Sequence, residues 1–206
     1  MATPTEYAGM TTFSKQDLSP NGWIALVHDF VPEHQAVMDA LVASLPLKSE
    51  RLRIMGREVA TPRLTSWHGD SGAGYRYSGR YFEPNPWTAE LDAVRDRLEA
   101  LLGVRFNSVL ANYYRDGRDS MGFHTDAEPE LGPNSPDDVL IASVSLGAPR
   151  RFVLQSKGTK ERRVFDLGEG SLFVMGGAVQ KHWRHGVPKT TRKVGPRLNL
   201  TFRTVR

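Results

Sequence analysis

Two segments in the first half of the chain place apolar residues at helical spacing and predict helices that pack on a sheet. The first lies between Pro32, which suits an early helical position, and Pro46, which ends the pattern. Its apolar face consists of Val37, Met38, Leu41, Val42 and Leu45. For the second helix we expect Asn85 as the cap, Pro86 in the first turn and Gly103 as the left-handed stop. Its apolar face consists of Trp87, Leu91, Val94, Leu98 and Leu101.

From Val104 onward the pattern changes to short apolar or alternating runs separated by Gly, Pro, Asn and Asp. Such runs are typical of β-strands, and they cover residues 104–114, 139–146, 151–155, 162–167, 170–175 and 197–205. Because no helical pattern separates them, they favour an antiparallel sandwich or jelly roll over a βαβ fold. Residues 48–84, rich in Arg, Gly and Tyr, are expected to form sheet and exposed loops.

The amino-terminal stretch MATPTEYAGMTTFSKQD is polar and lacks periodicity, so we expect residues 1–15 to form a flexible tail. This stretch has neither the basic region nor the apolar region of a signal peptide. No later stretch approaches the roughly 20 apolar residues of a membrane span. We therefore expect a soluble cytoplasmic protein that is not bound to a membrane.

Composition narrows the choice of partner and of metal. The 206 residues, 39% of them apolar, suit one compact domain. The balance of 27 Lys and Arg against 23 Asp and Glu gives a net charge of +4, which is compatible with a polyanionic partner. Because the chain has no cysteine, a transition metal must be held by histidine and carboxylate ligands.

The sequence His-Thr-Asp at residues 124–126 can supply two ligands to one metal ion. In an extended segment, residues two apart project to the same face, so His124 and Asp126 can converge. A non-haem iron(II) oxygenase requires a second histidine, which completes a facial triad of two histidines and one carboxylate. The candidates are His182 and His185, which would point to opposite faces of a strand, so only one of them can be the ligand.

A second His-x-Asp sequence shows that this spacing alone is a weak signal. His68 and Asp70 have the same separation, but they lie in SWHGDSGAGY, a glycine-rich stretch that we interpret as a loop. The simpler interpretation of any single histidine is a surface residue or a hydrogen-bonded core residue.

The strand expected near the carboxyl terminus carries a cationic face. In RLNLTFR, apolar residues alternate with the polar residues Arg197, Asn199, Thr201 and Arg203. Arginine binds carboxylates through a planar fork and stays charged when partly buried, so this face suits a dicarboxylate. Asn112 and Tyr114 form a similar polar pair on another strand. The alternatives are a half-buried strand with a solvated face and hydrogen bonding at a sheet edge.

The order NYY, HTD, GSLFVMGG, HWRHG and RLNLTFR resembles the AlkB family of DNA and RNA dealkylating dioxygenases. The resemblance covers roughly Arg51 to Arg206. The resemblance is strongest to the branch that repairs double-stranded DNA, and the segments that carry it are RIMGREVATPR, YRYSG and RLNLTFR. By position, the iron ligands would be His124, Asp126 and His185, the last chosen because a glycine follows it as in the family's His-Gly pair.

The resemblance also assigns the residues around the iron. Those matching the 2-oxoglutarate pocket are Asn112, Tyr114, Arg197, Asn199 and Arg203, to which we add Thr201 from the same strand face. The candidate base-binding residues are Trp67, Tyr75, Tyr77, Glu128, Met55 and Arg63. Met55 stands where the duplex-repair branch inserts an apolar wedge. That branch usually carries Phe where Met55 and Tyr77 stand, which weakens an assignment to duplex DNA.

The resemblance implies a fold and a reaction. The fold is a double-stranded β-helix (jelly roll), here over residues 104–206, preceded by helices and a nucleotide-recognition lid over residues 16–103. The cofactors are iron(II), 2-oxoglutarate and O2. The reaction oxidatively removes alkyl groups from bases of the 1-methyladenine or 3-methylcytosine type in DNA and releases aldehyde, succinate and CO2. A duplex base must first be flipped out, and we expect a monomer.

Three other functions remain open at this point. A related dioxygenase could act on methylated RNA, on a protein or on a small molecule. A non-catalytic β domain could bind nucleic acid through its Arg, Lys and Tyr residues, with structural histidines. A zinc hydrolase could use the same metal ligands, although it would not need the pair Arg197 and Arg203.

Overall fold

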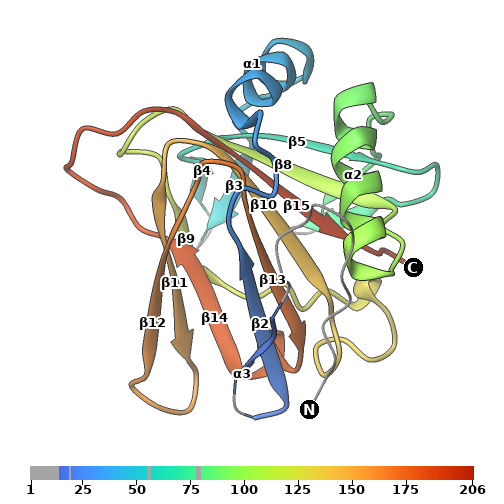
Figure 1. Ribbon diagram of the computed structural model, residues 1–206, viewed down its shortest axis with the longest axis vertical. Coiled ribbons are helices and arrows are strands. Elements are labelled where there is room, and N and C mark those ends of the chain that lie inside the picture. Colours follow the sequence, from blue (N-terminus) through green and yellow to red (C-terminus); the bar gives the residue numbers. More distant parts are fainter. Residues whose placement is uncertain (1–13, 19, 55–56, 78–79) are drawn as a thin grey trace.

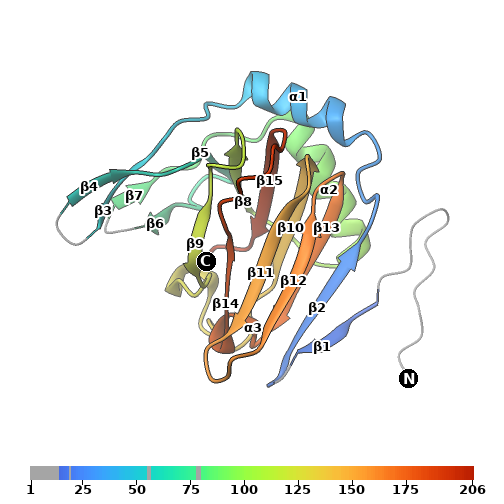
Figure 2. The same ribbon diagram turned by 90° about the vertical axis from the view of Figure 1, so that its left-hand side faces the viewer.

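The computed structural model describes residues 14–206 except 19, 55–56 and 78–79, and within 52–59 and 75–82 it describes the backbone alone. Two antiparallel sheets form the body of the molecule (Figures 1 and 2). The larger has the strand order β1 (Gln16–Leu18), β2 (Gly22–Val27), β13 (Ser171–Gly177), β10 (Ile141–Gly147), β15 (Arg197–Arg203), β8 (Ser108–Tyr114) and β5 (Leu64–Gly69). The smaller has the order β12 (Arg162–Leu167), β11 (Arg150–Ser156), β14 (Trp183–Val187) and β9 (Met121–His124). This arrangement confirms the predicted mainly antiparallel β fold.

Smaller elements surround the two sheets. Two hairpins, β3 (Arg51–Ile54) with β4 (Arg57–Ala60) and β6 (Tyr75–Tyr77) with β7 (Arg80–Phe82), project at one end (Figure 2). The helices are α1 (His34–Ser44), α2 (Ala89–Leu102) and the short α3 (Val179–His182), with a 3-10 turn at Pro129–Leu131. Among the described residues, no helix is long and apolar enough to span a membrane.

The larger sheet has a different apolar layer on each face. On one face, residues of α1 and α2 such as Leu41 and Leu98 pack on Val144, Leu200 and Phe202 of the sheet. Both predicted helices and their sheet-facing sides are thus confirmed. On the other face, side chains of the larger sheet pack against those of the smaller one, including Phe152 and Leu154. The space between the two sheets is where the polar residues of β15 and β8 point.

The predicted start of α2 is wrong in detail. Thr88, not Asn85, caps the helix, because its hydroxyl accepts a hydrogen bond from the Leu91 N–H at 3.3 Å. Asn85 instead extends the edge of β5, where its side-chain amide donates to the Trp67 carbonyl at 2.8 Å. Gly103 ends the helix as predicted, with a φ of 68°.

Several strands differ from their prediction. The expected run at 104–114 begins only at Ser108, and the last strand ends at Arg203. The stretch around His68 is not a loop, because His68 and Gly69 belong to β5 and pair with β8. Four strands had no predicted counterpart, namely β1, β2, β9 and β14. The sequence predicted the jelly roll over residues 104–206 alone. Strands β1, β2 and β5 precede residue 103 and still belong to the larger sheet, so that sheet contains residues from both sides of the predicted boundary.

The register of the larger sheet aligns its polar side chains in rows. Asn112 of β8 lies opposite Asn199 of β15, and Asn199 lies opposite Ser145 of β10. The neighbouring row joins Leu110, Thr201 and Ser143. Because directly paired residues share a face, these rows cover the wall that looks toward the smaller sheet. All seven residues of β15 are buried, which excludes the alternative of a strand with a solvated face.

Candidate functional site

His124, Asp126 and His185 come together between the two sheets. His124 ends β9 and lies opposite His185 of β14, while Asp126 follows two residues after His124. The His124 Nε2 atom is 3.8 Å from Asp126 Oδ1, and the His185 Nε2 atom is 3.6 Å from Asp126 Oδ2. One potential ligand atom from each residue lies within 4.8 Å of the others. Among the described residues this is the one such group, and it does not include His182, which ends α3.

His124 and His185 both direct Nε2 toward Asp126. The His124 Nδ1 atom is 2.9 Å from the Gly122 carbonyl, which places the ring proton on Nδ1 and leaves the Nε2 lone pair available. Burial and the neighbouring His124 lower the pKa of His185 to about 3, so its ring is neutral at physiological pH. Neutral imidazole is the ligating form of histidine.

Asp126 is held as a carboxylate although it is buried. Burial alone would raise its pKa, but the positive charge of Arg203 keeps the pKa below its ordinary value. The Arg203 Nη2 atom donates to Asp126 Oδ1 at 2.8 Å, and the Asp126 N–H donates to Gln180 Oε1 at 2.9 Å. Two imidazoles and one carboxylate match the ligand set of an iron(II) oxygenase, so the residues fit that metal.

An inner pocket adjoins this group and contains a buried cation. The Arg197 side chain donates to Ser145 Oγ at 2.7 Å and to Asn199 Oδ1 at 2.8 Å. Its Nη1 atom is buried and has no hydrogen-bond partner among the described residues, and none of their carboxylates forms an ion pair with it. Burial lowers the pKa of Arg197 to about 10, so it stays charged at neutral pH. A buried cation without an anion is costly unless a ligand supplies the anion.

The other residues predicted for this pocket differ in how they contact their neighbours. Tyr114 packs its ring 5.2 Å from the Arg197 guanidinium. Asn199 is largely occupied within the sheet, because its Oδ1 atom accepts from Arg197, Ser143 and Ser145. The Asn199 amide also donates to Thr201. The residues around the pocket are Leu110, Asn112, Tyr114, Met121, His124, Asp126, Ile141, Ser143, Phe152, Met175, His185, Gly186, Val187, Arg197, Asn199, Thr201 and Arg203.

The two arginines of β15 have different surroundings. Arg197 faces the inner pocket without an acidic partner among the described residues, whereas Arg203 forms an ion pair with the predicted metal ligand Asp126. Arg203 also lies 3.9 Å from Glu128 Oε1. The prediction grouped both as carboxylate binders, but β15 passes the metal group at its Arg203 end. The structure therefore gives Arg203 a contact that the sequence pattern did not indicate.

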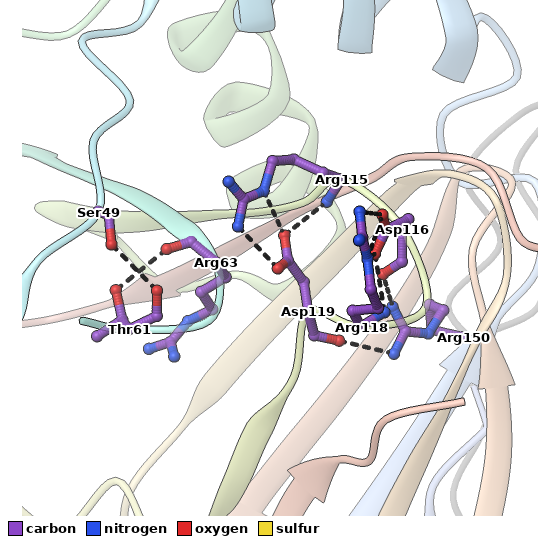
Figure 3. A network of polar contacts seen from close by, with 8 residues as sticks. All are labelled: Ser49, Thr61, Arg63, Arg115, Asp116, Arg118, Asp119 and Arg150. Carbon is purple, nitrogen blue, oxygen red and sulfur yellow. Dashed lines mark hydrogen bonds and ion pairs between the residues drawn. The ribbon is translucent and has the colours of Figure 1, made fainter. Parts of the chain in front are cut away.

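Sequence reasoning missed a fourth buried arginine, Arg150, which lies beside Tyr114 of the pocket. Arg150 donates to the backbone carbonyls of Asp116 and Asp119 (Figure 3) and to that of Pro188, each at 2.9 Å. It thereby connects the loop between β8 and β9 to the segment that follows β14. Arg115 braces the same loop through a bidentate ion pair with Asp119. A lone arginine at the start of a strand carries no periodic signal.

A larger outer cavity opens on the other side of the metal group. Its volume is about 260 Å³, against about 40 Å³ for the inner pocket. Three predicted base-binding residues, Arg63, Trp67 and Glu128, line it, and His124, Asp126 and Arg203 border both spaces. The lining also includes Pro46, Lys48, Glu50, Thr61, Thr65, Ser66, Glu83, Asn85, Leu110, Met121 and Thr125. Met55 and the side chains of Tyr75 and Tyr77 lie outside the described residues.

The second His-x-Asp sequence does not form a metal site. The two ring nitrogens of His68 contact the Ser66 hydroxyl at 2.8 Å and the Pro86 carbonyl at 2.7 Å. Burial lowers its pKa, so His68 is a neutral, hydrogen-bonded core residue. Asp70 turns instead to the indole N–H of Trp87 at 2.7 Å.

Comparisons with known proteins agree with this geometry. The model of the 2OG-Fe(II) oxygenase superfamily matches residues 24–203. The chain is 40% identical to the DNA oxidative demethylase ALKBH2 of Homo sapiens over 163 residues, which are 75% of this chain and 61% of that protein. It is also 40% identical to the alpha-ketoglutarate-dependent dioxygenase alkB homolog 3 of Mus musculus over 205 residues, 91% of this chain and 68% of that protein.

A solved structure shows the same fold. The structure of OsALKBH1 matches with a TM-score of 0.59 at 16% identity, covering 93% of this chain and 100% of that one. This likeness confirms the predicted jelly-roll architecture. The chain spans about three fifths of the length of human ALKBH2.

Proposed function

The chain belongs to the AlkB family within the 2OG-Fe(II) oxygenase superfamily, and we propose that it oxidatively removes alkyl groups from nucleobases. The observation that carries the proposal is the buried Arg197, which lacks an anion among the described residues and lines the same pocket as the His-Asp-His group. An iron(II) oxygenase that consumes 2-oxoglutarate needs both features in one pocket.

Each feature of the inner pocket has a role in this reaction. His124, Asp126 and His185 would hold iron(II) from one side, and bound iron with 2-oxoglutarate and O2 supplies the oxidising power. Arg197 and the neighbouring Tyr114 would bind the distal carboxylate of 2-oxoglutarate, because a guanidinium and a phenol are both donors to an anion. Arg203 keeps Asp126 ionised and therefore able to bind metal.

The outer cavity would hold the damaged base. Bases of the 1-methyladenine and 3-methylcytosine type are cationic, and Glu128 and the indole of Trp67 both favour a cation in that space. A base alkylated on its pairing edge must leave the duplex to reach the metal group, and the outer cavity beside that group provides space for it. The net charge of +4 favours association with a nucleic acid backbone.

We propose DNA as the substrate, and an RNA demethylase with the same core is the alternative. One relative is called a DNA oxidative demethylase. Another relative of equal identity has a name that does not mention a nucleic acid. A non-catalytic binding domain would have no use for a buried, anion-free arginine beside a metal-binding group. A zinc hydrolase would need the metal ligands but not Arg197.

An anaerobic titration tests the reaction class and the substrate together. The protein is loaded with iron(II) and 2-oxoglutarate without oxygen, and air and a methylated oligonucleotide are then added. We expect formaldehyde and succinate to appear in equal amounts, and faster with methylated DNA than with methylated RNA. A protein that binds the oligonucleotide but forms neither product under iron(II) would be a binding module and would contradict the proposal.

A further inference from the structure

One hydrogen bond links the wall of the outer cavity to the wall of the inner pocket. The Arg63 Nε–H donates to Asn112 Oδ1 at 2.7 Å. Arg63 lines the outer cavity and Asn112 lines the inner pocket, and the two residues are 6% and 5% exposed. A buried bond of this length holds both side chains in a defined orientation.

The chemistry of the two groups fixes which end of the amide faces the inner pocket. A guanidinium has donors only, so the atom of Asn112 that meets it must be the carbonyl oxygen. The Asn112 NH2 group is therefore turned away from Arg63, and it forms no hydrogen bond to another described residue. An amide that presents its NH2 group can donate to a carboxylate, whereas the opposite orientation would present oxygen to oxygen.

The backbone on both sides of this bond is firmly placed. The Arg63 carbonyl accepts from Thr61 Oγ1 at 3.1 Å, and Ser49 Oγ donates to the Thr61 carbonyl at 3.1 Å (Figure 3). Two residues after Arg63, Thr65 pairs with Asn112 across β5 and β8. Arg63 directly precedes β5, the strand that pairs with β8, so its backbone has little freedom to move away from Asn112.

We propose that Arg63 is a positioning residue for 2-oxoglutarate, which it serves by holding the Asn112 amide in the donating orientation. This rests on the proposed function. The Nη groups of Arg63 form no hydrogen bond to a described residue, and they belong to the wall of the outer cavity. A base that contacts them restrains the same guanidinium that orients Asn112, so the two cavities are coupled and each ligand raises the affinity for the other.

Binding of 2-oxoglutarate in the absence of nucleic acid tests this role apart from any contact with the base. Isothermal calorimetry is carried out without oxygen on the Mn(II)-loaded protein. Arg63→Met and Asn112→Ala should each weaken 2-oxoglutarate binding about ten-fold, the low end of the range for one lost hydrogen bond to a charged group. The double variant should bind no more weakly than Asn112→Ala, because Arg63 acts through Asn112.

Two further variants separate positioning from general damage to the fold. Arg63→Lys also offers only donors, so it should restore 2-oxoglutarate affinity to within about three-fold of the original protein. Lys48→Met removes another cation of the outer cavity that does not contact Asn112, and it should leave the affinity unchanged.

The outcomes are distinct. An unchanged 2-oxoglutarate affinity in Arg63→Met, or additive losses in the double variant, would overturn the positioning role while leaving the proposed function standing. If the unsubstituted Mn(II)-loaded protein does not bind 2-oxoglutarate, the proposed function fails and this role fails with it. Thermal unfolding of each variant shows whether a loss of binding reflects a loss of folded protein.

Discussion

The inner pocket and the outer cavity are built from different kinds of structure. The inner pocket takes most of its wall from seven-residue strands whose residues pair in continuous register. The outer cavity takes much of its wall from the connections around β3 to β7 and from the segment after β9. Residues on paired strands hold a geometry more exactly than residues on loops, which vary and adapt.

This difference matches the proposed roles of the two spaces. The inner pocket would bind the metal and 2-oxoglutarate, and the outer cavity would bind the base. Changes in the inner pocket should affect every nucleic acid substrate equally, whereas changes in the outer cavity should depend on the substrate.

Loss of a metal ligand should have the largest effect and should not depend on the substrate. His124→Ala, Asp126→Ala and His185→Ala should each lose bound iron and reduce turnover to background, because the described part of the chain offers one such ligand group. His182→Ala should keep its iron and most of its activity. Iron content and formaldehyde release measure both effects. An inactive His182→Ala beside a normal His185→Ala would show that the ligand assignment is wrong.

Arg203→Met should weaken iron binding through its effect on Asp126. In this variant Asp126 is still buried, which raises its pKa, but the positive charge of Arg203 that lowers the pKa is gone. The pKa of Asp126 should therefore rise. A protonated carboxyl group does not bind iron, so the variant should lose iron at a higher pH than the original protein when the pH is lowered. Iron content measured across a pH series shows this shift, and superimposable pH profiles would exclude it.

Arg197→Met should weaken 2-oxoglutarate binding and leave iron binding intact. Removing a charge-assisted contact typically costs about 1.5–3 kcal/mol, roughly ten- to a hundred-fold in affinity. Arg197→Lys should also be impaired, because an ammonium does not reproduce the planar fork. Calorimetry with 2-oxoglutarate and parallel iron analysis separate this variant from Arg203→Met. An unchanged 2-oxoglutarate requirement in Arg197→Met would contradict the assignment.

Glu128→Gln should change the outer cavity alone. Loss of the negative charge should raise the KM for a cationic methylated base by about ten-fold or less, as for one charged contact. The affinity for 2-oxoglutarate should change less than two-fold, although Glu128 lies near Arg203. Steady-state kinetics with the oligonucleotide varied, followed by 2-oxoglutarate varied, gives both values. Equal changes in the KM for the oligonucleotide and in the affinity for 2-oxoglutarate would show that the two cavities do not act separately.

Met55→Ala should have the smallest effect and the greatest dependence on substrate. If Met55 fills the gap left by an extruded base, its loss should slow repair of a methylated duplex by about five-fold, equivalent to about 1 kcal/mol. Repair of the same lesion in a single strand should be nearly unchanged. Tyr77→Ala, which removes a stacking surface, should slow both. Equal losses on the two substrates for Met55→Ala would favour a packing role.

The inner pocket was largely predictable from the sequence because its chemistry follows strand periodicity. Alternation in RLNLTFR placed Arg197 and Asn199 on one face. Strand parity allowed only one of His182 and His185 to be a ligand, but His182 ends α3 and does not share a strand with His185, so parity does not separate the two. Ser143 and Ser145, which hold Asn199, show the same two-residue spacing within an apolar run and could have been found by it.

Features that depend on contacts between distant segments were not predictable. The cap of α2 is Thr88 because Asn85 is engaged by β5, a pairing that no local pattern shows. Arg150 binds three carbonyls from two separate segments. Strands β9 and β14 are short and each contains a glycine, so their identity as strands comes from pairing with neighbours, β9 with β14 and β14 with β11 as well.

The rows of polar residues on the larger sheet also determine which kinds of genetic change the protein can tolerate. Insertion of one residue in β15 after Leu198 would turn Thr201 and Arg203 into the apolar layer beneath the helices and bring Leu200 into the pocket. A deletion would do the same. Insertions in the hairpins β3–β4 and β6–β7 would leave those rows intact. We therefore expect descendants of this gene to diversify by length in the hairpins and by substitution alone in β8 and β15.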